Sequence, residues 1–138
     1  MEPWKKAQED VKKEFNKITR KDFLFKPFAD TYSAGGKAIM PDQPSDFWVL
    51  DRGRYYVVEV KSCHQPKFYF KDIRPSQMIA ARRVPAAGGT SIFLITKLPE
   101  NKWHKVDGSL IYQMKQAGIV GIDWNQMTPI NLNWEEIK

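Results

Sequence analysis

Two acidic residues and one lysine carry the most informative chemistry in this sequence. Asp46 opens one strand-like run, and Glu59 and Lys61 stand near the end of the next. Side chains alternate along a strand, so Glu59 and Lys61 share one face while Val58 and Val60 take the other. Charges on a face that becomes buried are costly unless they pair or bind a metal. The spacing therefore indicates a paired or metal-binding cluster.

The residues between the two runs favour a turn that brings the carboxylates together. Residues 51–54 (DRGR) are a hairpin signal, in which Gly53 is free to adopt positive φ. In a closed hairpin Asp46 and Glu59 repel each other, and each holds its proton more tightly unless a cation bridges them. Mg²⁺ suits one or two carboxylates, with waters and a phosphate completing its shell.

Such a cluster suits phosphodiester hydrolysis. The metal would polarise a phosphoryl oxygen and lower the pKa of its bound water. Lys61 would orient or deprotonate the attacking water, or stabilise the phosphorane. The simpler alternative is a solvated ion pair between Glu59 and Lys61 on an exposed strand, which is a common arrangement. The hairpin signal, the earlier Asp46 and the basic composition favour the hydrolytic site.

Composition limits the class of protein. The 138 residues are one domain's length (residues 1–138), and 22 Lys and Arg against 16 Asp and Glu give a net charge of +6, which suits a polyanionic partner. The 42% hydrophobic content can close one core, which argues against wholesale disorder. The apolar runs are too short to cross a membrane, and no apolar signal segment opens the chain. The single Cys63 fits a reducing cytoplasm.

The helices and strands that position these residues can be predicted from the spacing of apolar residues and from the places of Pro and Gly. An apolar stripe with spacings of three and four predicts a helix over residues 3–20, with Pro3 in its first turn; the stripe consists of Trp4, Ala7, Val11, Phe15 and Ile18. A second helix is expected at residues 75–84, ended by Pro85, and a third at 109–116. Strands are expected at residues 22–30, 46–50, 55–60, 68–70, 91–96 and 119–124, with a loop at 33–45. This order predicts an α/β domain with a central mixed β-sheet flanked by helices.

Asp46, Glu59 and Lys61 resemble the PD-(D/E)XK nuclease motif. The wider context is similar to the RecU-type Holliday junction resolvases and their phage relatives. The similarity extends over residues 46–97: Ser45-Asp46-Phe47, then Arg52-Gly53-Arg54-Tyr55, Glu59-Val60-Lys61-Ser62, residues 68–73, Gln77, and the apolar strand 92–96.

This resemblance implies a fold, an activity and a set of roles. It implies a restriction-endonuclease-like homodimer that binds four-way DNA junctions and makes paired nicks with Mg²⁺ or Mn²⁺. By motif position, Asp46 and Glu59 would hold the metal, Lys61 would be the catalytic lysine, and Gln77 would lie near the active site.

The resemblance also calls for a carboxylate from the first helix, where this sequence departs from the pattern. Matching the start of the helix places Gln8 where a Glu is expected. Helical geometry at 100° per residue places Glu14 beside the apolar stripe and turns Glu9 roughly away from it. We therefore expect Glu14 to complete the site, with Glu9 as the alternative.

Among the basic residues, Lys37, Arg52, Arg54 and Arg74 are the expected contacts to DNA phosphates, which would give salt-dependent affinity with little sequence reading. Three other functions compete with a junction resolvase. The chain would instead be a nuclease on other DNA, such as a repair or restriction enzyme, a non-catalytic DNA-binding module on the same scaffold, or an interaction protein in which the Glu59–Lys61 spacing is accidental.

Overall fold

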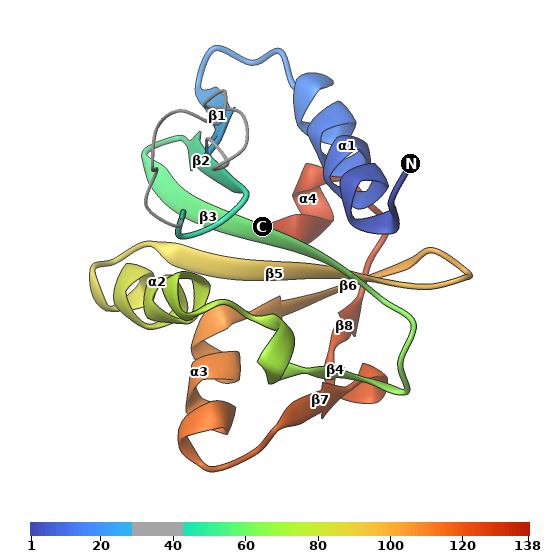
Figure 1. The fold of residues 1–138 in the computed structure, drawn as a ribbon. Helices are drawn as coiled ribbons and strands as arrows, with labels where there is room; N and C mark the ends of the chain where they lie inside the picture. Colours follow the sequence, from blue (N-terminus) through green and yellow to red (C-terminus); the bar gives the residue numbers. More distant parts are fainter. Residues whose placement is uncertain (29–42) are drawn as a thin grey trace, which may run out of the picture.

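A six-stranded mixed sheet forms the centre of the molecule (Figure 1). The computed structural model describes residues 1–28 and 43–138. The strands of the sheet are β1 (Phe23–Pro27), β2 (Phe47–Asp51), β3 (Arg54–Cys63), β5 (Thr90–Lys97), β6 (Lys102–Asp107) and β8 (Thr128–Pro129), in the spatial order β1-β2-β3-β5-β6-β8. The expected α/β fold with a central mixed sheet is confirmed.

The register of β2 and β3 fixes the part of the sheet that matters for chemistry. These strands pair antiparallel, with Phe47 opposite Val58 and Asp51 opposite Arg54. Gly53 has a φ of +82° in the turn between them, as the hairpin signal predicts. β3 then pairs in parallel with β5, which places Glu59 beside Phe93. A parallel neighbour needs a crossover connection, and here it contains a helix.

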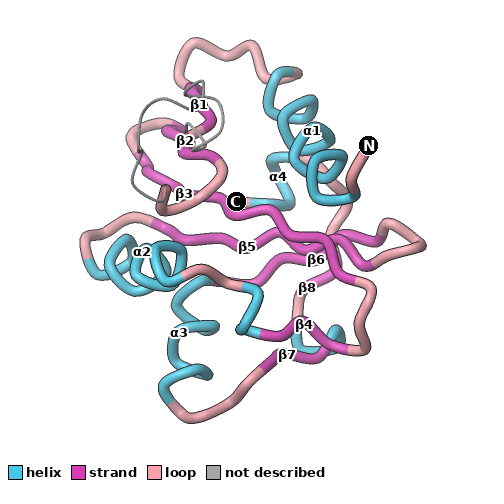
Figure 2. Tube along the Cα trace, in the orientation of Figure 1, coloured by secondary structure: helices cyan, strands magenta, loops and turns pink. Residues whose placement is uncertain are grey.

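Helices cover both faces of the sheet, as the tube in Figure 2 shows. The helices are α1 (Pro3–Asn16), α2 (Pro75–Ala86), α3 (Gly108–Gln116) and the short α4 (Trp134–Ile137), with 3-10 turns η1 (Phe70–Asp72) and η2 (Trp124–Gln126). α1 and α4 pack on one face, and α2 and α3 pack on the other, beside the small ladder of β4 (Lys67–Tyr69) and β7 (Gly121–Asp123). None of the described helices is long and apolar enough to span a bilayer.

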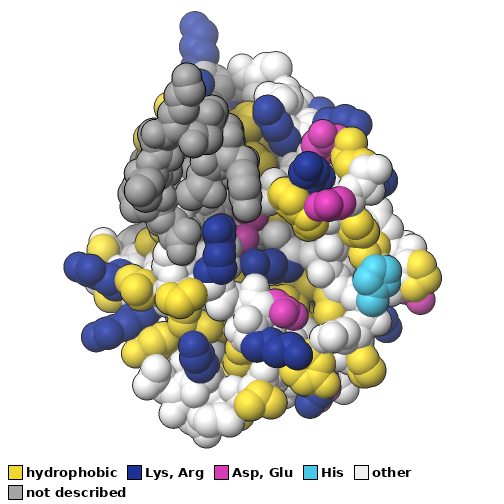
Figure 3. Space-filling view, viewed as in Figure 1, with side chains coloured by type: hydrophobic (Ala, Val, Ile, Leu, Met, Phe, Trp, Pro, Cys, Tyr) yellow, Lys and Arg dark blue, Asp and Glu magenta, His cyan; other side chains and the backbone are white. Residues whose placement is uncertain are grey.

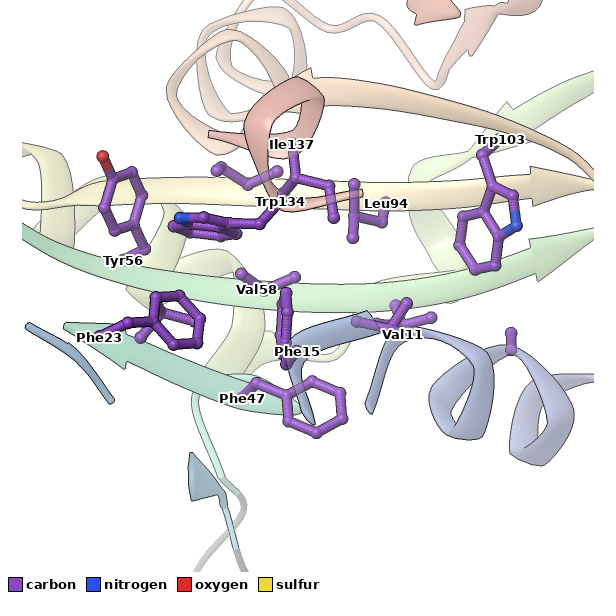
Figure 4. Packing of buried hydrophobic residues seen from close by; sticks show 14 residues of the cluster. Val11, Phe15, Phe23, Phe47, Tyr56, Val58, Leu94, Trp103, Trp134 and Ile137 are labelled. Carbon is purple, nitrogen blue, oxygen red and sulfur yellow. The ribbon is translucent and has the colours of Figure 1, made fainter. Parts of the chain in front are cut away.

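The core beneath α1 holds that helix against the sheet. Val11 and Phe15 are fully buried and pack with Val58, Phe47 and Trp134, as seen from close by in Figure 4. The Phe15 ring meets the rings of Phe47 and Trp134 edge to face, each pair with centroids 5.6 Å apart. Such contacts contribute about 0.5–1.5 kcal/mol each beyond their burial. The orientation of α1 over β2 and β3 is therefore well determined.

Some element boundaries and elements differ from those expected. The first helix ends at Asn16 rather than near residue 20, and α2 continues through Pro85 to Ala86. Pro85 has no N–H to donate to the carbonyl four residues earlier, so it removes one hydrogen bond from the last turn, and the helix ends one residue later. β6, β8 and α4 are not among the expected elements. The expected loop over residues 33–45 and the end of the first expected strand fall largely outside the described residues.

Candidate active site

The site lies in a cleft of about 720 Å³ between α1, the start of β2, the second half of β3 and the start of α2. Lys and Arg side chains gather near the middle of this face in Figure 3, in the region between α1 and the start of α2. The charged and polar side chains that line the cleft are Lys5, Gln8, Glu9, Lys12, Gln43, Ser45, Asp46, Glu59, Lys61, Ser62, Asp72, Arg74 and Gln77.

Asp46 and Glu59 meet here because of the hairpin register. Phe47 pairs with Val58, so the next step along the antiparallel ladder sets Asp46 opposite Glu59. The two side chains are close enough to hydrogen-bond to each other, which requires a proton on one of them. Glu59 is only 3% exposed, so the alternative of a solvated surface ion pair is wrong.

The two carboxylates are satisfied to different degrees. Asp46 accepts hydrogen bonds from the backbone N–H of Val60 (2.7 Å) and from the side-chain amide of Gln8 (2.9 Å). Glu59 Oε2 is buried and has no hydrogen-bond partner, the one such side-chain atom among the described residues. A buried acceptor without a partner costs about 1–3 kcal/mol, more if it is charged. A ligand or ion that binds Oε2 would therefore be favoured.

Electrostatics in the cleft oppose ionisation of both acids. Burial raises the pKa of Glu59 well above its ordinary value of 4.5, and the neighbouring charge of Asp46 raises it further, although Lys61 and Arg74 act in the opposite direction. Burial also raises the pKa of Asp46, against the lowering effect of its hydrogen bonds. Two carboxylates in such close contact, one of them buried, need either a shared proton or a cation.

Lys61 stands next to the acidic pair, on the face predicted from strand alternation. Its Nζ lies 3.7 Å from Glu59 Oε1 and donates a hydrogen bond to the backbone carbonyl of Asp72 at 3.1 Å. The carbonyl of Asp72 thus keeps the ammonium group beside the cleft, where it is partly exposed. In this position Lys61 can meet a phosphate or a water above the carboxylates.

Gln77 and Arg74 come from the start of α2. Gln77 is 2% exposed, and its Oε1 accepts a hydrogen bond from the backbone N–H of Arg74 at 3.0 Å. This contact caps the first turn of α2, so part of the role of Gln77 is structural. Arg74 lines the rim of the same cleft, where the sequence placed a phosphate contact.

Glu14 does not reach the site, contrary to the expectation. It forms an ion pair with Lys17 at 2.8 Å and does not line the cleft, whereas Glu9 and Gln8 do. The cleft lies over the first half of α1, and a helix rises 1.5 Å per residue, so Glu14 stands about 9 Å beyond Gln8 along the axis. The residue of α1 that contacts Asp46 is Gln8.

Two of the other residues predicted to contact DNA, Arg52 and Arg54, are not found at the cleft. Arg52 pairs with Asp22 at 3.1 Å, and neither Arg52 nor Arg54 lines the cleft. Both lie at the turn of the hairpin, about 16 Å along β3 from Glu59. The structure therefore does not bring them together with Arg74 at the site. Lys37 lies outside the described residues.

Sequence reasoning matched Gln8 to the site but missed Trp4, Lys5 and Lys12 on the wall that α1 contributes. Trp4, Gln8 and Lys12 recur every four residues, and Lys5 adjoins them, so all four face the cleft. The i, i+4 spacing was a signal for a shared face. It was hidden because Trp4 also fitted the apolar stripe.

The donor set fits a divalent cation that keeps several of its own waters. The described residues contain no cluster of three or more His, Cys, Asp or Glu side chains able to hold a metal. Two carboxylates, one of them with an unpartnered buried oxygen, are what Mg²⁺ commonly takes from a protein that leaves room for a phosphate. The cleft has that room beside Asp46 and Glu59.

Comparison with known proteins identifies the fold. No family model matches the chain, and no curated protein is similar to it in sequence. Among solved structures it is similar to Hjc, a Holliday junction resolvase from the archaeal hyperthermophile Archaeoglobus fulgidus, with a TM-score of 0.58 and 17% sequence identity. The match covers 91% of this chain and 94% of that one. The chain therefore shares the fold of that structure; the match does not single out the RecU type or a phage member.

Proposed function

We propose that this chain is a metal-dependent DNA endonuclease that resolves four-way junctions by hydrolysing phosphodiester bonds. One observation carries the proposal. Asp46 and the buried Glu59, whose Oε2 has no hydrogen-bond partner among the described residues, converge beside Lys61 in a cleft that Arg74 also lines, on a fold shared with a Holliday junction resolvase. A buried acid with a strongly raised pKa in a cleft, such as Glu59, is typical of catalytic and metal sites.

The cation of this proposal is Mg²⁺ or Mn²⁺, held by Asp46 and Glu59. When bound, it supplies a Lewis acid for the phosphoryl oxygen and acidifies a water. Asp46 is kept in place by Val60 and Gln8, so Gln8 acts as a positioning residue. Lys61 orients the attacking water or stabilises the charge that develops on the phosphate, because its ammonium group is fixed by the Asp72 carbonyl.

The substrate of the proposal is branched DNA. Resolution of a junction needs two nicks on separate strands, and a homodimer places two identical cleavage sites at a fixed separation. The RecU-type resemblance of residues 46–97 supports this choice of substrate. The net charge of +6 and the position of Arg74 at the rim support contact with phosphates.

A second candidate function is a non-catalytic DNA-binding module. It is favoured by the neutral Gln8 in the site, which leaves two carboxylates at the centre of the cleft. A two-carboxylate site binds a divalent cation less tightly than a three-carboxylate site, since each added charge strengthens the attraction. Metal-dependent cleavage separates this candidate from the first.

The experiment is a cleavage assay on a synthetic four-way junction, a flap and a linear duplex, each with Mg²⁺, with Mn²⁺ and with EDTA. We expect metal-dependent nicks at symmetric positions on two strands of the junction, and weak or no cleavage of the duplex. The Asp46→Asn variant should bind the junction and fail to cut it. Equal cleavage of all three substrates would support a nuclease with another DNA target. Binding without cleavage in either metal would support the non-catalytic module.

A further inference from the structure

Trp4 is an exposed aromatic side chain at the mouth of the cleft. It is 46% exposed, whereas Ala7, Val11 and Phe15 on the same helix are 2% exposed or less. Trp4 was expected to join that apolar stripe, and the structure instead places it among the residues that line the cleft. A tryptophan with so much apolar surface in water, beside a cleft, suits a binding contact.

Two neighbouring side chains contact the Trp4 ring. Its indole N–H donates to the carboxylate of Glu2. The Lys5 Nζ lies 5.3 Å from the ring centroid, within range of a cation–π contact. Contacts of this kind reduce the conformational entropy that the ring loses when a planar partner binds to it.

Lysines accompany Trp4 on the wall that α1 turns toward the cleft. Lys5 and Lys12 are seven residues apart and lie on one side of the helix, with Gln8 between them. Glu9 lies on the same wall and offsets part of their charge. The neighbouring Lys13 is exposed but does not line the cleft. Positive charge beside an exposed aromatic ring is the combination that binds unpaired nucleic acid, because phosphates meet the charges and bases meet the ring.

We propose that this wall of α1 binds DNA beside the scissile phosphate, with Trp4 stacked on a nucleobase whose face is left uncovered at the branch point and Lys5 and Lys12 on the flanking phosphates. The inference rests on the proposed nuclease function and adds the contact that selects branched DNA. Inside a duplex both faces of each base are covered by neighbouring pairs, whereas a base at a branch point or in a single strand has a free face. Trp4 therefore discriminates between these DNA forms.

The test is equilibrium binding of the full chain, in EDTA, to a four-way junction, a single strand and a linear duplex. We expect Trp4→Ala to weaken binding to the junction and the single strand about tenfold and to the duplex less than twofold. Trp4→Phe should retain most of the affinity, since a phenyl ring also stacks. Leu110→Ala removes a similarly exposed apolar side chain (41%) from α3 and should change none of the three affinities.

A matched pair of lysine variants tests the rest of the wall. Lys12→Ala should reduce the slope of log affinity against log salt concentration by about one. Lys13→Ala, on the same helix, should leave this slope nearly unchanged. Circular dichroism should show an unchanged helix content in each variant.

The outcomes separate this inference from the proposed function. Unchanged affinities in Trp4→Ala, or equal losses on the duplex and the junction, would overturn the stacking role even if the wild-type protein cuts junctions. If Trp4→Ala loses the preference for the junction and the single strand over the duplex, the stacking role is supported even if the wild-type protein cuts no DNA. A wild-type protein that binds none of the three DNAs at low salt would overturn both.

Discussion

The β2–β3 hairpin has a buried acid at each end, Asp51 and Glu59, and the two acids differ in their hydrogen-bond partners. At one end Asp51 is 3% exposed and accepts hydrogen bonds from Trp134 Nε1 (2.9 Å) and the Arg20 guanidinium (3.0 Å), with Lys138 Nζ at 3.5 Å. At the other end Glu59 is equally buried, but its Oε2 has no hydrogen-bond partner among the described residues, and its Oε1 lies 3.7 Å from Lys61 Nζ.

The pKa values of Asp51 and Glu59 are shifted in opposite directions. Burial would raise the pKa of Asp51, but the hydrogen bonds from Trp134 and Arg20 outweigh it and hold the pKa below the ordinary value of 3.8. Burial and the charge of Asp46 raise the pKa of Glu59. Asp51 thus joins β2 to the C-terminal helix and stabilises the fold. Glu59 destabilises the metal-free fold when it ionises, which is the cost of keeping a binding site ready.

The largest expected difference between the two ends is in catalysis. Glu59→Gln should lower junction cleavage by about 10³-fold or more, because the site loses a metal ligand and charge that cannot be replaced by an amide. Asp51→Asn should change the cleavage rate little in protein that remains folded. Single-turnover cleavage rates at saturating Mg²⁺ measure both. Comparable losses in the two variants would remove the distinction between a functional and a structural end.

The next largest effect is on stability at the Asp51 end. Asp51→Asn should lower the free energy of unfolding by about 2–3 kcal/mol at pH 7, since it removes charge-assisted hydrogen bonds to buried donors. A carboxylate with a depressed pKa stabilises the fold above its unfolded pKa of 3.8, and this contribution is lost as the pH falls through the lower folded value. Urea denaturation from pH 7 to pH 3 should show the variant and the wild type converging. A constant difference would contradict the assignment.

Glu59→Gln should have the opposite effect on stability. The folded pKa of Glu59 lies above its unfolded value of 4.5, so the wild-type protein loses stability as the pH rises from 4.5 through the folded pKa. In EDTA at pH 8 the variant should therefore be about 1–2 kcal/mol more stable than the wild type, with the difference vanishing near pH 4. Thermal unfolding in EDTA across this range checks the sign. A variant that is less stable than the wild type at pH 8 would contradict it.

The smallest effect concerns Gln8. Gln8→Glu adds a carboxylate beside Asp46 and should tighten Mn²⁺ binding about tenfold, because the site gains one negative charge. Gln113→Glu on α3 makes the same change on an exposed part of another helix and should leave the affinity unchanged. Calorimetric titration of the DNA-free protein measures both, independently of activity. Equal changes in both variants would point to a general charge effect instead of a local ligand.

Much of the site could be predicted from strand chemistry. Alternation in residues 57–61 placed Glu59 and Lys61 on one face, and the turn around Gly53 set Asp46 opposite Glu59. These features are local, because they depend on a two-residue period and a turn between adjacent strands.

The other features of the fold and the site depend on how elements far apart in the sequence pack together, and the spacing of apolar residues carries no information about that packing. The angle of Glu14 about the helix axis was reasonable, but its height along α1 relative to the cleft is set by the packing of Phe15 on the sheet. β6 was missed because it alternates weakly and gains its order from pairing with β5. The donors to Asp51 come from residues 20, 134 and 138, far away in sequence.

The measurement that tests the central claim most directly is Mn²⁺ binding to the full chain without DNA, followed by electron paramagnetic resonance. We predict that the wild-type protein and Asp51→Asn bind the ion, and that Asp46→Asn and Glu59→Gln each lose that binding at pH 8. Binding that persists unchanged when either Asp46 or Glu59 is neutralised, or a wild-type protein that binds no ion with and without junction DNA, would contradict the claim that the two acids hold a cation.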